Sequence, residues 1–338
     1  MEVRFGIMGV GWWTRNVHIP NLLRVADARI VALCSRSKEN REAGAKLCSG
    51  QPRLFERYED MLACDEVDAV IVSTPNVFHA EQAAAALRAG KHVLCEKPLA
   101  LTRKDARLVT QAAAGSERVV AAGYELRSAD VSSAVREAVC AGRVGAPLMV
   151  MGRFWRSWGP MTRGWRGERE MSGGPVPELF SHTADLQAYL MGEAPQTVYG
   201  KAGAIEGPPY WDRVSVISDY PCGAVGVANM CLVAWGMKED YPVEVVGEDG
   251  RLVGDVVKGE LTLWPKGGGE PQDLSPRRSG APLHGFPGSQ ELVQEFTDCV
   301  SGRRPAPRCG LADAIATCAI CLAVEQSIAR GRPVRVKV

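Results

Sequence analysis

The sequence predicts an α/β domain with a parallel sheet over residues 1–122 and an α+β domain with a large, mainly antiparallel sheet over residues 123–338. The chain has 338 residues, more than one small core requires, which favours two domains. In the first part, nearly continuous apolar runs alternate with helical patterns, as in a parallel sheet covered on both faces. After Tyr124, the strand-like segments alternate between apolar and polar residues, which is typical of antiparallel sheets.

Short apolar runs predict the strands of the parallel sheet in chain order. The first run ends in glycines, and the third is the strongest, a nearly unbroken series of Val, Ile and Ala. The predicted strands are Val3–Met8, Arg29–Cys34, Val67–Ser73, His92–Cys95 and Val119–Ala122. Helical patterns fill the intervals at Asn40–Cys48, Tyr58–Cys64, Val77–Ala89 and Thr102–Ala114.

The second part begins with a predicted helix, Asp130–Ala141, and ends with two more, Gln290–Ser301 and Leu311–Arg330. The strand-like segments between them are Leu148–Trp155, Thr197–Ile205, Val214–Tyr220, Ala224–Val233, Val243–Gly247 and Leu261–Trp264. The stretch 265–287 is rich in Gly and Pro, which predicts a long loop.

Composition excludes several classes of protein. The formal net charge is +1, so no charge excess draws the chain to nucleic acid or to an anionic membrane. No run of about 18 apolar residues predicts a membrane span, and the first strand begins too early to leave room for a secretory signal. Eleven scattered cysteines favour a reducing cytoplasm over a disulfide framework. We expect Cys318 and Cys321 to be buried thiols and expect no metal site, because no second matching pair completes a zinc site.

The sequence Gly9-Val10-Gly11 follows the first strand and opens a helix. This is the strand–turn–helix context of a dinucleotide fingerprint, in which glycines let the backbone approach the pyrophosphate. The third glycine position carries Thr14. We therefore assign Gly9, Gly11, Trp12 and Trp13 to a cofactor site at the helix N-terminus.

The end of the second strand predicts which nicotinamide cofactor binds. NAD sites usually place Asp or Glu there to accept from the ribose 2′-hydroxyl, but Ser35 takes that place, and Arg36 and Lys38 follow. Ser, Arg and Lys can bind a 2′-phosphate that a carboxylate would repel. This pattern favours NADP(H), with NAD(H) still possible. A solvated basic turn without a ligand is the alternative.

Two motifs follow the next pair of strands. Thr74, Pro75 and Asn76 follow one of them, with His79 close behind, and Glu96 and Lys97 follow the other. The carboxyl ends of parallel strands border the ligand crevice of such sheets, so both motifs are predicted to line it. A lysine there can donate to a substrate oxygen and to the nicotinamide amide.

The motif Glu96-Lys97-Pro98-Leu99, preceded by Ala89-Gly90-Lys91-His92-Val93, resembles the Gfo/Idh/MocA family of glucose–fructose oxidoreductase and inositol dehydrogenase. The resemblance extends over most of the chain. It implies a Rossmann domain followed by an open-faced sheet domain, and it implies that Lys97 is catalytic.

The second signature of this family is a glycine pair followed by an acid, a histidine and an aspartate. Here Gly173 and Gly174 precede Glu178, His182 and Asp185, although the family usually has Asp at the position of Glu178. A helix starting near Pro177 would place these three polar side chains on one site-facing edge. His182 suits a general base or acid, and Glu178 could orient it or bind a substrate hydroxyl.

The segment between Arg153 and Arg169 combines tryptophans and arginines that could stack on a sugar and hold an anion. They are Trp155, Trp158 and Trp165 with Arg153, Arg156, Arg163, Arg166 and Arg169. The equally weighted alternative is a strand with a solvated loop or a subunit contact. The pair Trp165-Arg166 resembles a family motif and is assigned to the substrate with Lys97, Glu178 and His182. Arg127 resembles a family position of uncertain role.

These patterns predict a cytoplasmic NADP(H)-dependent oxidoreductase that transfers a hydride to or from a secondary alcohol or ketone carbon of a sugar, sugar derivative or cyclitol. Two alternatives stay open, a non-catalytic dinucleotide-binding regulator and a hidden-redox, sugar-cleaving enzyme with a tightly bound cofactor. The prediction requires Lys97 and His182 to meet over the nicotinamide. A broad exposed sheet face also favours self-association as a homodimer or homotetramer.

Overall fold

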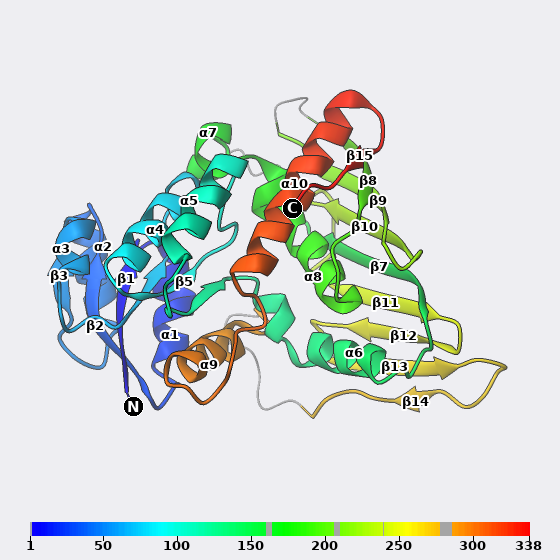
Figure 1. Ribbon diagram of the computed structural model, residues 1–338, viewed down its shortest axis with the longest axis horizontal. Coiled ribbons are helices and arrows are strands. Elements are labelled where there is room, and N and C mark those ends of the chain that lie inside the picture. Colours follow the sequence, from blue (N-terminus) through cyan, green and yellow to red (C-terminus); the bar gives the residue numbers. More distant parts are fainter. Residues whose placement is uncertain (1, 160–163, 206–209, 239, 278–285) are drawn as a thin grey trace. The chain divides into compact units, whose positions relative to one another are not determined.

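The strands at the start of the chain form a six-stranded parallel sheet in the computed structural model, in the order β3-β2-β1-β4-β5-β6 (Figure 1). The structure describes residues 2–159, 164–205, 210–238, 240–277 and 286–338. The sheet consists of β1 (Val3–Met8), β2 (Ala28–Cys34), β3 (Arg53–Phe55), β4 (Ala69–Val72), β5 (His92–Cys95) and β6 (Val120–Ala122). This order is that of a doubly wound dinucleotide-binding sheet, so the predicted Rossmann domain is confirmed.

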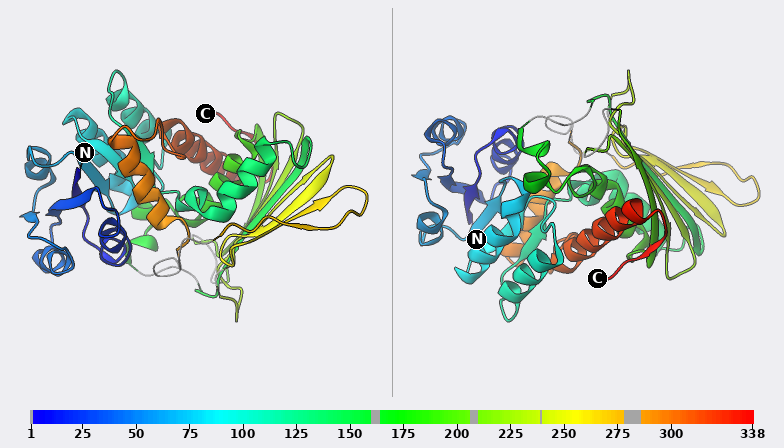
Figure 2. Two further views of the ribbon diagram at one scale, coloured as in Figure 1. Left: turned by 90° about the horizontal axis from the view of Figure 1, so that it is seen from below. Right: turned by 90° about the horizontal axis from the view of Figure 1, so that it is seen from above.

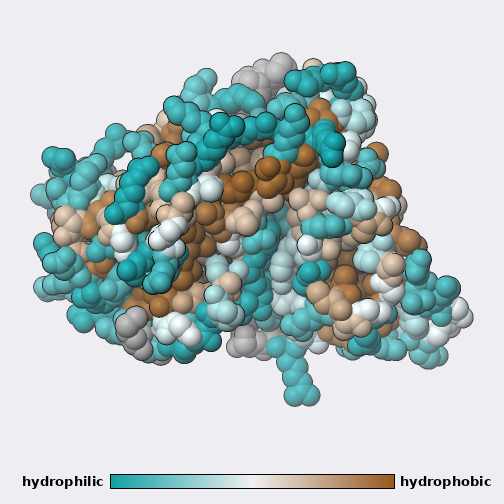
Figure 3. Space-filling model, viewed as in Figure 1, coloured by the Kyte–Doolittle hydropathy of each residue, from teal (hydrophilic) through white to brown (hydrophobic). Residues whose placement is uncertain are grey.

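Helices alternate with these strands because each crossover between parallel strands needs a covering element. They are η1 (Thr14–His18), α1 (Ile19–Leu22), α2 (Lys38–Ala45), α3 (Tyr58–Leu62), η2 (Asn76–Phe78), α4 (His79–Arg88) and α5 (Arg103–Ala113). Helix α9 (Ser289–Val300), from much later in the chain, also packs on this sheet. On one face of the sheet Val70 and Val72 pack with residues of α3, α4 and α5, and on the other Ile71 packs with residues of α1 and α9. On the face shown in Figure 3, hydrophilic side chains are interspersed with apolar ones.

The structure divides the chain differently from the predicted boundary between residues 122 and 123. One unit contains Met1–Glu125 together with Pro282–Ile315, and the other contains Leu126–Ala281 together with Ala316–Val338. The reason is that α9 covers the β1 face of the parallel sheet, where the Phe296 ring lies 6.1 Å from that of Phe5. In addition, Ala122 N donates to Cys309 O at 3.0 Å, which extends the β6 edge.

The second unit has a nine-stranded sheet in the order β14-β13-β12-β11-β7-β10-β9-β8-β15. All neighbouring strands are antiparallel except β7 and β10, so the mainly antiparallel prediction is confirmed. The strands are β7 (Pro147–Trp155), β8 (Thr197–Gly203), β9 (Arg213–Asp219), β10 (Val225–Cys231), β11 (Pro242–Gly247), β12 (Gly250–Asp255), β13 (Glu260–Pro265), β14 (Gln272–Asp273) and β15 (Val334–Arg335).

Helices cover one face of this sheet. They include α6 (Asp130–Cys140), α8 (Ser181–Met191) and α10 (Leu311–Arg330), while η3 (Glu125–Ser128), η4 (Gly164–Arg166), α7 (Arg169–Ser172) and η5 (Val176–Phe180) are short. Figure 2 shows α6, α8 and α10 on the same side of the strands, with none of the described helices of this unit on the other. The alternating burial of β9 and β10 reflects this one-sided cover.

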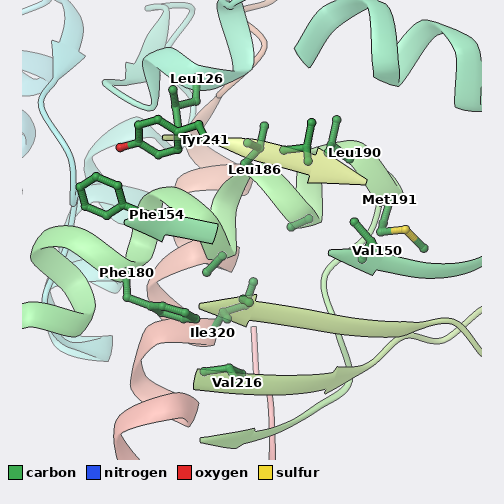
Figure 4. Close-up of a cluster of buried hydrophobic side chains, with 14 of the residues drawn as sticks. Leu126, Val150, Phe154, Phe180, Leu186, Leu190, Met191, Val216, Tyr241 and Ile320 are labelled. Atoms are coloured by element: carbon green, nitrogen blue, oxygen red, sulfur yellow. The ribbon is translucent and has the colours of Figure 1, made fainter. Parts of the chain in front are cut away.

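The core of the second unit lies between α8, α10 and the sheet. Phe154, Phe180, Leu186, Val216 and Ile320 converge there from different elements (Figure 4). Helix α8 also contacts the sheet through Gln187, whose Nε2 donates to Val227 O at 2.7 Å. By length and composition α10 could cross a membrane, but half of its most apolar window is buried inside the protein, as in a core helix.

The elements predicted from the sequence agree with these bounds to within a few residues, but the short helices η3, η4 and α7 were not among them. Strands β3, β12, β14 and β15 were not predicted, and β14 lies within the stretch predicted as a long loop, of which residues 278–285 are outside the described residues. The helix expected near Pro177 begins instead as the π-helix η5, whose Ser181 N–H donates to Val176 O, and continues as α8.

Candidate active site

The turn after β1 is built so that only glycine fits at its first position. Gly9 has a φ of +90°, and an added Cβ would lie 2.3 Å from Ser73 O at the end of β4. The Thr14 hydroxyl donates to Gly9 O at 2.5 Å, which closes the turn. At Gly11, by contrast, no atom lies within 4 Å of an added Cβ. The turn therefore leaves open space beside the first amides of a helix, where the N–H groups lack partners within the helix and an anion such as a pyrophosphate fits.

Glu96, at the end of β5, is held by two residues from the helix after the glycine turn. Trp13 Nε1 donates to Glu96 Oε1 at 2.8 Å, and His18 Nε2 lies 2.9 Å from the same oxygen. Burial alone would raise the pKa of the Glu96 carboxyl, but His18, then Lys97 and Trp13, outweigh it and hold that pKa below its ordinary value. A carboxylate ion therefore lies next to Lys97 and ties the glycine turn to the end of β5.

Trp12 is 57% exposed and so differs from its neighbour Trp13. Its indole ring is available at the surface beside the glycine turn. The assignment of Trp12 and Trp13 to the cofactor stays a prediction, but the structure gives Trp13 a second role in anchoring Glu96.

His79 joins the loop after β4 to the loop after β5. Its Nε2 lies 2.7 Å from Thr74 O and its Nδ1 lies 2.8 Å from Pro98 O. The Thr74 hydroxyl donates to Gln82 Oε1 at 2.7 Å, and Asn76 is buried. The structure therefore brings Thr74–Asn76 and Lys97 to neighbouring loops of one sheet edge, as predicted from the ends of parallel strands, while the cofactor contacts assigned to Thr74, Pro75, Asn76 and His79 stay predictions.

The turn after β2 presents exposed cations. Ser37 caps α2 by accepting from Asn40 N at 3.1 Å, and Arg41 binds Ser35 O and Glu56. Lys38 is 81% exposed, and its partner is distant, with Lys38 Nζ 3.8 Å from Glu42 Oε1. Arg36 is exposed and makes no hydrogen bond or ion pair with the described residues. Two cations at this turn are thus available to a ligand.

Glu178 is an ion-paired carboxylate in η5 of the second unit. Its side chain is 3% exposed, and Arg166 Nε donates to its Oε1 at 2.9 Å. The Arg166 guanidinium also lies 4.5 Å from the centre of the Trp165 ring. The predicted group Trp165, Arg166 and Glu178 is therefore brought together. π-Helices are rare in proteins, and those that occur are often found at functional sites. The π-helix at Glu178 fits this pattern.

His182 lies in the first turn of α8 and is 8% exposed. The centre of its ring is 6.4 Å from that of Phe154, which stacks on Tyr241 at 4.9 Å (Figure 4). Aromatic packing on this side limits the orientations that the imidazole can adopt. A group suited to proton transfer thus packs against an aromatic ring on one side.

Asp185 does not continue a site-facing edge, so that part of the sequence interpretation was wrong. Its carboxylate accepts from Arg127 Nε at 2.7 Å, from Arg127 Nη2 at 2.8 Å and from the Thr317 hydroxyl at 2.7 Å. Asp185 and Arg127 are both buried, so they form a structural ion pair. This pair anchors α8 at a position three residues after His182. It also identifies a partner for Arg127, whose role was uncertain from the sequence.

Most arginines of the tryptophan-rich segment bind within the protein. Arg153 pairs with Asp240 at 2.7 Å, and Arg169 pairs with Glu325 at 2.8 Å. Arg156 is buried and lies 3.5 Å from the centre of the Trp158 ring. Arg163 is outside the described residues. These pairings favour a structural role for Arg153 and Arg169, whereas Arg166 contacts a predicted site residue.

The predicted residues thus form two groups, one in each unit. Gly9, Gly11, Glu96 and Lys97 belong to the first, and the group around Glu178 and His182 belongs to the second. Sequence patterns gave no sign of His18 or Thr317 as partners, because both contacts join residues far apart in the chain. Within the described residues no group of three or more His, Cys, Asp or Glu side chains could hold a metal ion.

Comparison with known proteins gives matches to both parts of the chain. Residues 3–124 match the oxidoreductase family with an NAD-binding Rossmann fold, GFO/IDH/MocA, and residues 132–253 match its C-terminal domain. The 1,5-anhydro-D-fructose reductase of Ensifer adhaerens is 36% identical over 193 residues, which is 57% of each chain. The inositol 2-dehydrogenase of Rubrobacter xylanophilus is 30% identical over 74% of this chain and 71% of its own. A levoglucosan dehydrogenase solved with NADH has the same fold, with a TM-score of 0.89 and 19% identity over the whole of both chains.

Proposed function

The chain belongs to the Gfo/Idh/MocA oxidoreductase family, and from that premise we propose that it transfers a hydride between NADP(H) and a secondary carbinol carbon of a sugar, sugar derivative or cyclitol. The observation that carries the proposal is a pair of side chains, the buried Glu178 of η5, which Arg166 holds, and His182 four residues later in the first turn of α8. The relatives named as an anhydrofructose reductase and an inositol dehydrogenase support a polyol substrate.

In this proposal each residue has a distinct role. The bound nicotinamide supplies the hydride acceptor or donor. His182 removes the hydroxyl proton as the alcohol is oxidised and returns it when the ketone is reduced. Lys97 donates to the same substrate oxygen and so stabilises the charge that develops on it. Glu178 accepts from a neighbouring substrate hydroxyl, and its buried ion pair keeps the carboxylate in place.

The glycine turn and the loops after β4 and β5 fit the cofactor. Gly11 leaves room for the pyrophosphate. The Glu96 carboxylate, next to Lys97 in the chain, is bound by Trp13 and His18. We assign NADP(H) rather than NAD(H) because Arg36 has no partner among the described residues and Lys38 is exposed. Arg36→Ala should weaken NADPH binding by about tenfold or more, since it removes a charge-assisted hydrogen bond, and should leave NADH binding unchanged. Tighter binding of NADH than of NADPH by the wild type would contradict this preference.

Turnover with a panel of sugars, keto sugars and inositols tests the catalytic roles. Lys97→Met and His182→Asn should each lower kcat by about 10²-fold or more, with the Kd of NADPH nearly unchanged. Lys104→Met is the matched control, because Lys104 is an exposed lysine of α5 and its loss should leave kcat unchanged. Full activity of the Lys97 variant would refute its role. Cofactor binding without turnover of any polyol would refute the enzyme and favour a regulator.

We also propose that the chain forms a homodimer or homotetramer through the face of the nine-stranded sheet that no described helix covers (Figure 2). Ile217 is 51% exposed on β9 and lies between its cross-strand partners Tyr199 and Val227, and such an apolar row on an open face favours self-association. Light scattering should give a mass of at least two chains, and Ile217→Lys should shift it towards one.

We further propose that the protein works in the cytoplasm. All eleven cysteines are free thiols, as a reducing compartment favours.

A further inference from the structure

Tyr210 has a buried hydroxyl without a partner. Its side chain precedes β9 and is 7% exposed, and its hydroxyl has neither solvent contact nor a hydrogen bond among the described residues. Of the tyrosines in the described ranges, Tyr210 alone combines these properties, whereas the buried Tyr58 donates to Gln82 O at 2.9 Å. Because an unpaired buried hydroxyl is unfavourable, its presence calls for a partner outside the protein's own groups.

The surroundings of Tyr210 are those of the proposed substrate group. Burial raises the pKa of the Tyr210 phenol, the Glu178 carboxylate raises it further, and Arg166 acts in the opposite direction. The phenol therefore lies within the electric field of both members of that ion pair. The next residue, Trp211, has the Arg169 guanidinium 5.9 Å from the centre of its ring, so the segment before β9 lies beside the one that carries Arg166.

We propose that Tyr210 is a substrate-binding residue whose hydroxyl bonds to an oxygen of the polyol held beside Glu178, an inference that rests on the proposed function. The Arg166 side chain that holds Glu178 is 37% exposed, so this group borders the surface from which a substrate enters. Binding then pairs a hydroxyl that the free protein leaves unpaired. Such a site selects strongly for an oxygen at one position, since a substrate lacking it leaves the phenol unsatisfied.

Tyr210→Phe removes only the hydroxyl and tests this role. The KM for the best polyol of the panel should rise about tenfold, while kcat and the Kd of NADPH change less than about threefold. The melting temperature should stay the same or rise, because the phenylalanine buries no unpaired polar group. Tyr220→Phe is the matched control, because Tyr220 is 2% exposed and lies at the β9–β10 turn, and it should leave KM unchanged.

Monodeoxy analogues of the same polyol identify the oxygen. For the analogue that lacks the contacted oxygen, wild type and Tyr210→Phe should have equal KM values, whereas the other analogues should keep the tenfold difference. An unchanged KM of Tyr210→Phe for every substrate, with a raised melting temperature, would reduce Tyr210 to a purely structural residue.

Direct binding separates this inference from the proposed function. Calorimetric titration with D-glucose, 1,5-anhydro-D-fructose and myo-inositol measures affinity without turnover. If the wild type binds one of them but never oxidises or reduces it, the proposed function fails, while a loss of binding in Tyr210→Phe still supports the inference. If the wild type turns a polyol over and Tyr210→Phe binds it equally well, the inference alone fails. If none of the three binds and none is turned over, both fail.

Discussion

The two glycines of the turn after β1 should respond in opposite ways to the same added methyl group. In Gly9→Ala the methyl group must retreat from 2.3 Å to beyond 3.0 Å from Ser73 O, and a φ of +90° is strained for alanine. We expect a loss of about 3 kcal/mol or more, which lowers the melting temperature by roughly 6–12 °C for a domain of this size. In Gly11→Ala the methyl group meets no atom within 4 Å, and alanine restricts the unfolded chain, which stabilises the fold by about 0.4–1 kcal/mol, so stability should be kept or rise.

Cofactor binding should separate the two effects. Gly11→Ala should weaken NADPH at least tenfold, because its methyl group occupies the space through which the backbone approaches the pyrophosphate. The measurements are thermal unfolding without ligand and fluorescence titration with NADPH, with Gly50→Ala, an exposed glycine with no atom within 4 Å of an added Cβ, as the control. Wild-type affinity of Gly11→Ala would refute the pyrophosphate position, and an unchanged melting temperature of Gly9→Ala would refute the close approach to Ser73.

Two further predictions concern ion pairs. Arg127→Met leaves Asp185 charged and buried, which should lower the free energy of urea unfolding by about 3–5 kcal/mol. The control Arg251→Met breaks a more exposed pair with Glu244 and should lower it by less than about 1 kcal/mol. Equal effects would contradict a structural role for the buried Arg127. The lowered pKa of Glu96 means that its contribution to stability is complete above the ordinary carboxyl pKa of 4.5 and is lost as the pH falls through the lower folded value. The difference in melting temperature between wild type and Glu96→Gln should therefore shrink as the pH falls below about 4, and a difference that grew in this range would be inconsistent with the lowered pKa.

Much of the site could be predicted because its residues lie at places that local patterns mark. The glycine turn, Glu96 and Lys97 each follow a strongly apolar strand, and the ends of parallel strands meet at one edge whatever the details of packing. Glu178 and His182 are four residues apart, a spacing that predicts neighbouring side chains on an α-helix.

The local sequence determined the strands β1, β4 and β5, the glycine turn and the family motifs, because burial on both faces leaves a continuous apolar run in the chain itself. Only the tertiary structure decided that α9 covers the parallel sheet and that β3, with two of its three residues exposed, joins its edge. It also decided that Asp185 pairs with Arg127 rather than facing a substrate, and that Tyr210 lies in the field of Glu178. The physical reason is the separation of the contacting residues along the chain. Periodicity in the sequence reports only on the environment of neighbouring residues. The contacts above join side chains dozens of residues or more apart, and only tertiary packing selects among the partners that each could take.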